Sequence, residues 1–247
     1  MTDRPILFSA PMVLRLLDGS KTQTRRTIGL AEMQRSETPG YDWTWRGQAP
    51  IRSIAQQRKH PHGCWQDVSN DRLLALCPYY QVPGDRLYVR ETWRASSWEG
   101  DESAVPCADI DYCADGTTRH VPIGGDADIW RDKQNAYALA HGGKEVDGCI
   151  IRVDADGMMD ESPWPWRPSI FMPRWASRLS LTVTSVRVER VQEISEADAR
   201  AEGVTDDGLG GTAREMYARL WESINGAGSW AKGPWVWVIG FEKGGAT

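Results

Sequence analysis

The chain has 247 residues, 40% of them hydrophobic and 26% charged, which is ordinary for a folded globular protein and excludes a fibrous or wholly disordered chain. The net charge of −5 argues against a protein that coats nucleic acid, because that mode of binding needs many basic residues on the phosphates. No apolar run approaches the roughly 18 residues of a membrane helix, and the N-terminus lacks a signal-peptide pattern, so we expect a cytoplasmic protein without a membrane partner.

The charges are unevenly distributed along the chain. Residues 1–30 and 162–190 carry an excess of basic side chains, whereas residues 96–161 are strongly acidic. The basic segments are therefore candidates to line a binding site that the acidic segment borders.

The cysteine and histidine residues do not suggest a metal site or a disulfide framework. An odd number of cysteines, five, favours reduced thiols. His60, His62, Cys64 and Cys77 fit none of the common zinc-ligand spacings. We expect no metal, no other cofactor and no disulfide.

The N-terminal third shows one clear helix and one clear strand. Ser9 is a good N-cap and Gly19 a good residue to end a helix, so we predict a short helix between them. Residues 30–80 lack sustained periodicity, and we interpret them as a loop-rich insertion. Residues 86–93 alternate as in a strand and place Glu91 on an apolar face.

The middle of the chain contains a second insertion followed by a long strand. Residues 96–165 are rich in glycine and turn residues, with short strands expected around 108–112 and 149–153. Residues 179–190 alternate but change register at Ser185, which predicts a long strand with a β-bulge.

The C-terminal part predicts two helices and a final strand. The helices are expected over residues 195–203 and 212–226, the second one beginning with a capping box, and the strand over residues 235–241. Strands far apart in the sequence with few helices indicate an α+β fold around a mostly antiparallel, barrel-like sheet.

The stretch after the first helix carries the most information about function. It reads Gly19-Ser-Lys21-Thr-Gln-Thr24-Arg-Arg26, a group of cations and hydroxyls. Lys21 and Arg26 can neutralise a phosphate or polarise a carbonyl, and the Thr24 hydroxyl can attack if deprotonated. By itself the pattern also fits cations that stabilise the negative end of a helix dipole.

This stretch resembles the G-x-K-x-x-T-x-R signature of the ASCH family, phage-type members in particular. Four further segments are similar to the family pattern: residues 84–93 (GDRLYVRETW), 166–178 (WRPSIFMPRWASR), 220–226 (LWESING) and 234–238 (PWVWV). The resemblance implies a PUA-like β-barrel with flanking helices. It also predicts one domain over residues 1–247, with insertions at about 30–80 and 96–165.

The resemblance further implies an amidohydrolase that removes the acyl group from N4-acetylcytidine or a similar cytosine. Carried over by motif, the catalytic residues are Lys21, Thr24 and Glu91, with Thr24 or water as the nucleophile and Lys21 as its base. The predicted substrate-binding residues flank them and are Arg26, Arg90, Arg174, Trp175 and Arg178.

Three alternatives stay open at this point. A carboxylate near Lys21 and the preceding helix end both favour the charged ammonium, so the same residues also fit a non-enzymatic pocket that reads a base in RNA or phage DNA. Glu91 is alternatively an inward carboxylate paired with Arg90 or Arg178. For Trp175, packing in the core competes with stacking on a base.

Overall fold

The computed structural model describes residues 3–27, 32–46, 65–75, 77–79, 84–99, 106–146, 149–151, 164–204 and 210–244. These residues contain both helices and strands, with runs of several strands between helices, and the fold is α+β as predicted. The chain forms two compact units. The first comprises Met1–Arg4, Asp18–Leu87 and Leu181–Gly244, and the second comprises Pro5–Leu17, Tyr88–Ser180 and Gly245–Thr247.

The largest sheet has five strands in the order β1-β6-β12-β13-β2. These strands are β1 (Asp3–Leu7), β6 (Arg86–Arg90), β12 (Ser180–Arg190), β13 (Trp235–Lys243) and β2 (Gln23–Thr27). β13 lies antiparallel between β12 and β2. Among the described residues β1 and β2 are the two edges of this sheet, so these strands do not close into a barrel.

The predicted bulge in the long strand is confirmed. The register between β12 and β13 shifts between Val183 and Ser185. Gly240 on β13 lies opposite Ser185, and a Cβ at Gly240 would collide with the Ser185 hydroxyl. A glycine at this position leaves room for the Ser185 hydroxyl, which a larger residue would force to turn away.

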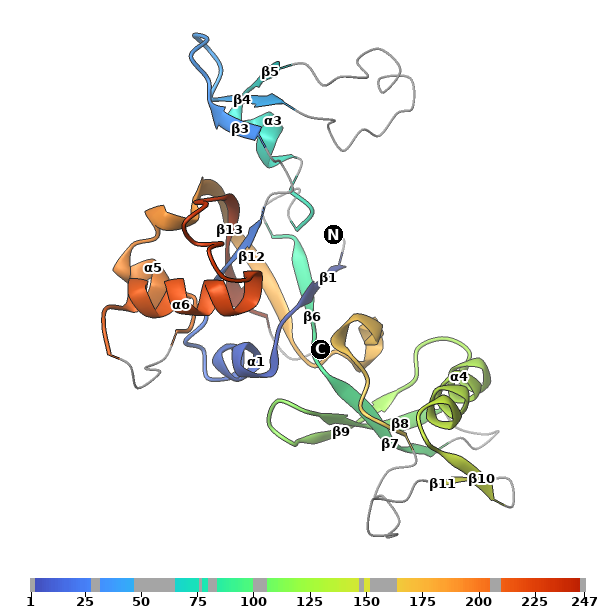
Figure 1. The fold of residues 1–247 in the computed structure, drawn as a ribbon. Helices are drawn as coiled ribbons and strands as arrows, with labels where there is room; N and C mark the ends of the chain where they lie inside the picture. Colours follow the sequence, from blue (N-terminus) through green and yellow to red (C-terminus); the bar gives the residue numbers. More distant parts are fainter. Residues whose placement is uncertain are drawn as a thin grey trace. The chain divides into compact units, whose positions relative to one another are not determined.

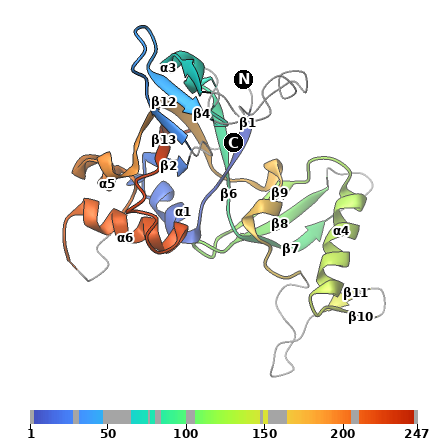
Figure 2. The same ribbon diagram turned by 45° about the horizontal axis from the view of Figure 1, so that its top comes forward.

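Two helices pack on one face of the first unit's sheet, as Figures 1 and 2 show. They are α5 (Glu196–Ala201) and α6 (Ala213–Asn225), and a 3-10 turn, η3 (Val191–Glu193), precedes them. The predicted caps are present: Ser195 accepts a hydrogen bond from the Asp198 amide, and Thr212 forms a capping box. Tyr217 and Trp221 of α6 belong to a buried cluster with Val236 and Val238 of β13.

Residues 32–75 contain more regular structure than the loop-rich insertion that the sequence predicts. The three antiparallel strands β3 (Glu32–Arg35), β4 (Trp43–Arg46) and β5 (Trp65–Val68) precede helix α3 (Asn70–Leu74). The buried Trp43 lies edge-on to Trp235, with ring centroids 4.9 Å apart. Strands of four residues are too short to show a period, so the sequence pattern missed them. His60, His62 and Cys64 lie outside the described residues.

The second unit begins with the predicted helix, α1 (Ala10–Leu17), which buries Val13 and Leu16. The predicted strand over residues 86–93 ends earlier than expected, because β6 stops at Arg90 and a new strand begins at Trp93. Leu87, Tyr88 and Val89 are all buried, so alternation alone does not describe the environment of β6.

The predicted acidic insertion also contains regular structure. A three-stranded antiparallel sheet is made of β7 (Trp93–Glu99), β8 (Cys107–Tyr112) and β9 (Thr118–Pro122). Helix α4 (Ala127–Ala140) lies along this sheet in Figure 2, and the hairpin β10 (Lys144–Val146) with β11 (Cys149–Ile151) follows it. The two short strands predicted in this region correspond to β8 and β11.

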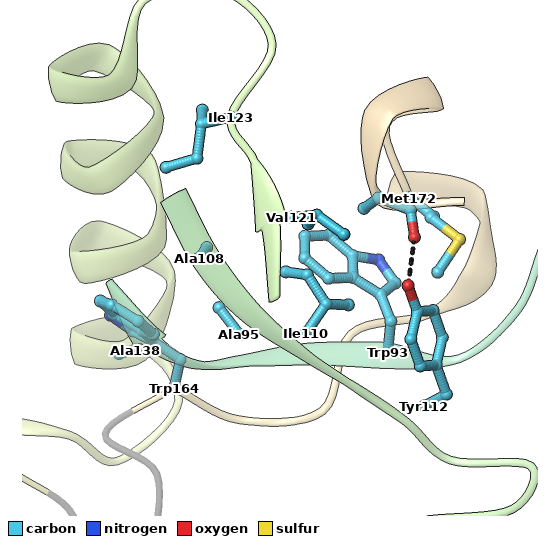
Figure 3. Close-up of a cluster of buried hydrophobic side chains, with 11 residues drawn as sticks. Trp93, Ala95, Ala108, Ile110, Tyr112, Val121, Ile123, Ala138, Trp164 and Met172 are labelled. Carbon is cyan, nitrogen blue, oxygen red and sulfur yellow. Dashed lines mark hydrogen bonds between the residues drawn. The ribbon is translucent and has the colours of Figure 1, made fainter. Parts of the chain in front are cut away.

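A hydrophobic core holds the second unit together (Figure 3). Trp93, Ile110 and Tyr112 are fully buried, and Met172 reaches them from the segment of two 3-10 turns, η1 (Ser169–Phe171) and η2 (Arg174–Ala176). The Tyr112 hydroxyl donates a hydrogen bond of 2.8 Å to the carbonyl of Ala176. The unit therefore has a core of its own. Throughout the described ranges, no helix is long and apolar enough to span a membrane.

Candidate functional site

Lys21 forms a buried ion pair that the sequence did not predict. Helix α1 ends before Gly19, whose φ of +80° suits glycine, and Lys21 then pairs with Glu202 in an isolated antiparallel bridge. Lys21 Nζ donates to Glu202 Oε2 at 2.9 Å and to the Glu202 carbonyl at 2.7 Å. The two side chains are 2% and 4% exposed. Glu202 therefore is the carboxylate that holds the Lys21 ammonium.

Arg25, which lies on strand β2, binds the same Glu202 carboxylate. Its Nη1 donates to Glu202 Oε1 at 3.0 Å, and its Nε donates to Glu189 Oε1 at 3.0 Å. The Arg25 side chain is completely buried, and Asp198 lies 3.4 Å from its Nη2. Both oxygens of Glu202 are thus occupied by cationic donors, which fixes the orientation of the carboxylate.

Arg187 completes the group, which we call the Lys21–Glu202 cluster. It donates to Glu189 Oε2 at 3.1 Å and to Asp198 Oδ2 at 3.0 Å. The cluster contains three cations and three carboxylates: Lys21, Arg25, Arg187, Glu189, Asp198 and Glu202. The three positive and three negative charges balance, and Lys21, Arg25 and Glu202 form the buried part of the cluster, whereas Arg187 is 44% exposed.

The cluster changes the proton affinity of its buried members. Burial lowers the pKa of Lys21, and the charge of Glu202 and its hydrogen bond to Lys21 oppose this only in part. Burial and the nearby Glu202 carboxylate raise the pKa of Tyr217 well above its usual value. Lys21 is therefore a lysine that gives up its proton more readily than one in water, beside a carboxylate that can position it.

Thr24 and Arg26 lie on the opposite face of β2. Their register partners on β13 are Ile239 and Trp237, whereas Arg25 between them pairs with Val238. Side chains alternate along a strand, so Thr24 and Arg26 point away from the face on which Arg25 and Lys21 both contact Glu202. This geometry does not favour direct proton transfer from the Thr24 hydroxyl to Lys21.

Glu91, the predicted catalytic carboxylate, lies in the second unit and is held by Arg178. Arg178 donates from Nε and Nη2 to the two Glu91 oxygens, each at 2.9 Å. Its Nη1 donates to Asp115 Oδ2 at 2.8 Å and to the Thr117 hydroxyl at 2.6 Å. The alternative of an inward Glu91 paired with an arginine is therefore the arrangement present, with Arg178 as the partner.

Burial controls the chemistry of this second pair. Glu91 is 1% exposed, and burial raises its pKa while the hydrogen bonds and charge of Arg178 lower it in part. The Arg178 guanidinium also lies over the Tyr112 ring, 4.1 Å from its centroid. Burial raises the pKa of Tyr112 to about 12. The pair of Glu91 and Arg178 fits a structural role in the second unit.

The remaining predicted binding residues have partners within the second unit. Arg90 donates to the Ile170 carbonyl at 3.0 Å and to the Tyr88 hydroxyl at 2.9 Å. The Arg174 guanidinium lies 5.3 Å from the centroid of the Tyr88 ring. Trp175 lies edge-on to Trp130 with centroids 5.4 Å apart. Packing in the core thus accounts for Trp175, as the alternative expected.

The structure brings Lys21 together with Arg25 and Glu202 in the first unit, and Glu91 together with Arg178 in the second. Sequence reasoning missed Glu202, which lies 181 positions from Lys21 in the chain. The sequence offered only a weak signal for Glu202. This residue lies between the helix that begins at Ser195 and Gly203, and a polar residue is common at the end of a helix whether or not it has a function.

Metal ligands do not gather in the part of the chain that the structure describes. No group of three histidine, cysteine or acidic side chains there is arranged to hold an ion. Cys77, Cys107 and Cys113 are free thiols. A comparison of the sequence with protein-family models, with characterised proteins and with solved structures found no match. Membership of the ASCH family stays a prediction from the motifs.

Proposed function

We propose that the chain is an amidohydrolase that removes an acyl group from the exocyclic N4 of a cytosine or cytidine, and that its strands belong to a PUA-like ASCH barrel. The observation that carries the proposal is the buried contact between Lys21 Nζ and Glu202 Oε2 at 2.9 Å. The family resemblance assigns a lysine, a threonine and a glutamate to catalysis. This contact brings together two of these residue types, the lysine of the motif and a glutamate.

The physical argument starts from the cost of burying this pair. Taking a lysine and a glutamate out of water costs several kcal/mol per ion, and apolar residues of similar size often replace such pairs without loss of stability. Buried ionisable groups with shifted pKa values occur often at catalytic sites. Burial lowers the pKa of Lys21, which makes the neutral amine, the form that can accept a proton, easier to reach than in water.

In the proposed reaction, Lys21 first loses its ammonium proton to solvent, which its lowered pKa favours, and the neutral amine then takes a proton from a water molecule as the water oxygen adds to the acyl carbon. The bond between the acyl carbon and N4 then breaks, and the proton returns from Lys21 to N4. The products are a carboxylic acid and the free amine of cytosine. Glu202 positions Lys21, because it accepts hydrogen bonds from both Lys21 and Arg25.

The test is release of cytidine from N4-acetylcytidine, separated by chromatography, with purified wild type and matched variants. We expect Lys21→Met and Glu202→Gln to lose at least a hundredfold in kcat/KM, since removal of a general base typically costs about 10²–10⁴-fold. The matched carboxylate variant is Glu91→Gln, which we expect to retain turnover at a pH where the variant is folded. Loss of turnover in Glu91→Gln with retention in Glu202→Gln would instead support the original assignment of Glu91.

A second variant separates the two possible nucleophiles. Thr24→Val preserves the shape of the side chain but removes the hydroxyl. With water as the nucleophile, we expect turnover to remain within about tenfold of wild type, which corresponds to about 1.4 kcal/mol in the barrier. Complete loss would assign the attack to Thr24. Absence of turnover in wild type, with this and other N4-acylated cytosines, would refute the proposal.

A further inference from the structure

Tyr217 carries a buried hydroxyl group that the packing of its ring does not explain. The side chain lies on helix α6 and is 4% exposed. Its ring packs against those of Trp221 and Trp230, with centroids 6.3 and 6.2 Å apart. The ring also belongs to the buried cluster that contains Val236 and Val238. A phenylalanine ring would make all of these contacts, so the hydroxyl adds nothing to them.

The Tyr217 hydroxyl has no hydrogen-bond partner within the described ranges. The charges of Glu202 and Arg25 act on it, but no described group exchanges a hydrogen bond with it. Burying a hydroxyl without a partner costs free energy, because its hydrogen bonds to water are lost and not replaced. A hydroxyl that is kept at this cost indicates a partner from outside the chain.

Tyr217 lies beside the Lys21–Glu202 cluster. The Arg25 guanidinium is 5.7 Å from the centroid of the Tyr217 ring, and Arg25 donates to Glu202 Oε1 at 3.0 Å. Across strands β2 and β13, Arg25 pairs with Val238, which belongs to the same buried cluster as Tyr217. Tyr217 and the Lys21–Glu202 cluster therefore share one face of the sheet.

The buried cations of the Lys21–Glu202 cluster are already engaged with its carboxylates. Lys21 and Arg25 both donate to Glu202, and Arg25 also donates to Glu189. A negative charge that develops on a substrate beside the cluster would have to compete with these carboxylates for their donors. The Tyr217 hydroxyl is a donor without that competition. Burial and the charge of Glu202 raise the pKa of Tyr217, so the hydroxyl keeps its proton.

We propose that the Tyr217 hydroxyl donates a hydrogen bond to the acyl oxygen during hydrolysis and is a further catalytic group, an inference that rests on the proposed function. As the water oxygen adds to the acyl carbon, one electron pair of the carbonyl bond moves onto the acyl oxygen, which accepts the hydrogen bond. When the bond to N4 breaks, this pair returns to form the carbonyl again. The tyrosine proton stays on the tyrosine throughout, and the fixed donor stabilises the transition state more than the ground state.

The test compares Tyr217→Phe with wild type in the full chain, by turnover of N4-acetylcytidine and by thermal unfolding. We expect kcat to fall about a hundredfold with KM within about twofold, since loss of one oxyanion donor typically costs about 10²–10³ in kcat. We expect the Tm of Tyr217→Phe to equal or exceed that of wild type, because the hydroxyl has no partner in the folded chain. A structural role of the hydroxyl would instead lower the Tm.

The matched control is Tyr112→Phe in the second unit. The Tyr112 hydroxyl donates to the Ala176 carbonyl at 2.8 Å, so its loss should lower the Tm while the kcat of the folded variant stays that of wild type. The inference alone is overturned if wild type is active and Tyr217→Phe is equally active. It is also overturned if the Tm of Tyr217→Phe falls as far as that of Tyr112→Phe. Absence of turnover in wild type overturns the proposed function together with this inference.

Discussion

Replacement of Arg178 by methionine would leave the Glu91 carboxylate buried without its cation. Arg178 makes two hydrogen bonds to Glu91 and one each to Asp115 and Thr117, and its side chain is 7% exposed. Breaking a buried pair by removing one partner typically costs about 3–5 kcal/mol. Arg178→Met should therefore destabilise the second unit by about this amount at pH 7.

The pH dependence follows from the two carboxylates. Burial raises the pKa of Glu91 in the folded chain, so Glu91 favours the folded state while it is protonated, and this contribution is lost as the pH rises through the folded pKa. Without Arg178 that pKa rises further. Burial tends to raise the pKa of Asp115, but the hydrogen bond from Arg178 helps to lower this pKa overall. The ionised Asp115 carboxylate therefore stabilises the folded state, and this contribution is lost as the pH falls through the folded pKa. The Glu91 effect makes the difference between wild type and Arg178→Met smaller at pH 5 than at pH 7, whereas the Asp115 effect appears only below the ordinary aspartate pKa of about 3.9.

Native-state amide hydrogen exchange measures this cost for each unit separately. Amides of β8 in the second unit should exchange faster in Arg178→Met, whereas amides of β13 in the first unit serve as the internal reference. Arg131→Met is the matched control, because a surface ion pair contributes about 1 kcal/mol or less. The reasoning is refuted if Arg178→Met costs less than about 1 kcal/mol, or if its cost is the same at both pH values.

Three further predictions test the packing of the two units. Trp93→Ala removes a fully buried indole from the second unit's core and should cost about 3–5 kcal/mol in urea unfolding, whereas the same change at Trp166, which is 40% exposed, should cost far less. Tyr112→Phe removes the donor to the Ala176 carbonyl and should cost about 1–2 kcal/mol in the free energy of unfolding. In wild type, alkaline titration of tyrosine absorbance should show one group ionising near pH 12. Because burial raises the pKa of Tyr112 in the folded chain, its contribution to stability is full below pH 10 and is lost as the pH passes about 12. Thr212→Ala removes the capping box of α6 and should cost about 1 kcal/mol, and Thr212→Ser should restore most of it; equal stability of the alanine and serine variants in thermal unfolding would contradict this account.

The sequence predicted well those helices and strands whose ends are marked by a particular residue. Ser195 and Thr212 mark the beginnings of α5 and α6, and Gly19 and Gly226 lie where α1 and α6 end. Each of these positions requires a particular side chain or a positive φ, so a single residue identifies it. The bulge before Ser185 was visible for a similar reason, because it shifts the alternation of an eleven-residue strand.

The core of the second unit could not be predicted in this way. Helix α4 buries only Gln134 and Ala138, so its sequence shows little amphipathic pattern. Much of the apolar cover comes from Trp164 and Met172, which lie beyond the acidic stretch in the sequence. A core built from distant segments leaves no local period, and composition alone then indicates a loop.

The candidate site was predicted in part for the same physical reason. Lys21 was identified from its motif, but its partner Glu202 is defined only by tertiary structure. Glu91 shared a strand pattern with apolar residues, which correctly indicated burial, and Arg178 was one of the two partners expected for it. The pairing of a buried charge depends on which segments meet in space, and one sequence without that information allows several partners.

The position of β13 affects how the chain folds as it is synthesised. Strand β2 spans Gln23–Thr27, yet its neighbour β13 spans Trp235–Lys243, far later in the sequence. Synthesis at roughly 5–20 residues per second leaves β2 without its antiparallel partner for many seconds. The strands β7, β8 and β9 all lie within about thirty residues of the sequence, so their sheet can form on the ribosome. Synthesis of β13 is therefore the event that completes this sheet, and a truncation that removes β13 would leave the edge of β2 free to pair with other chains.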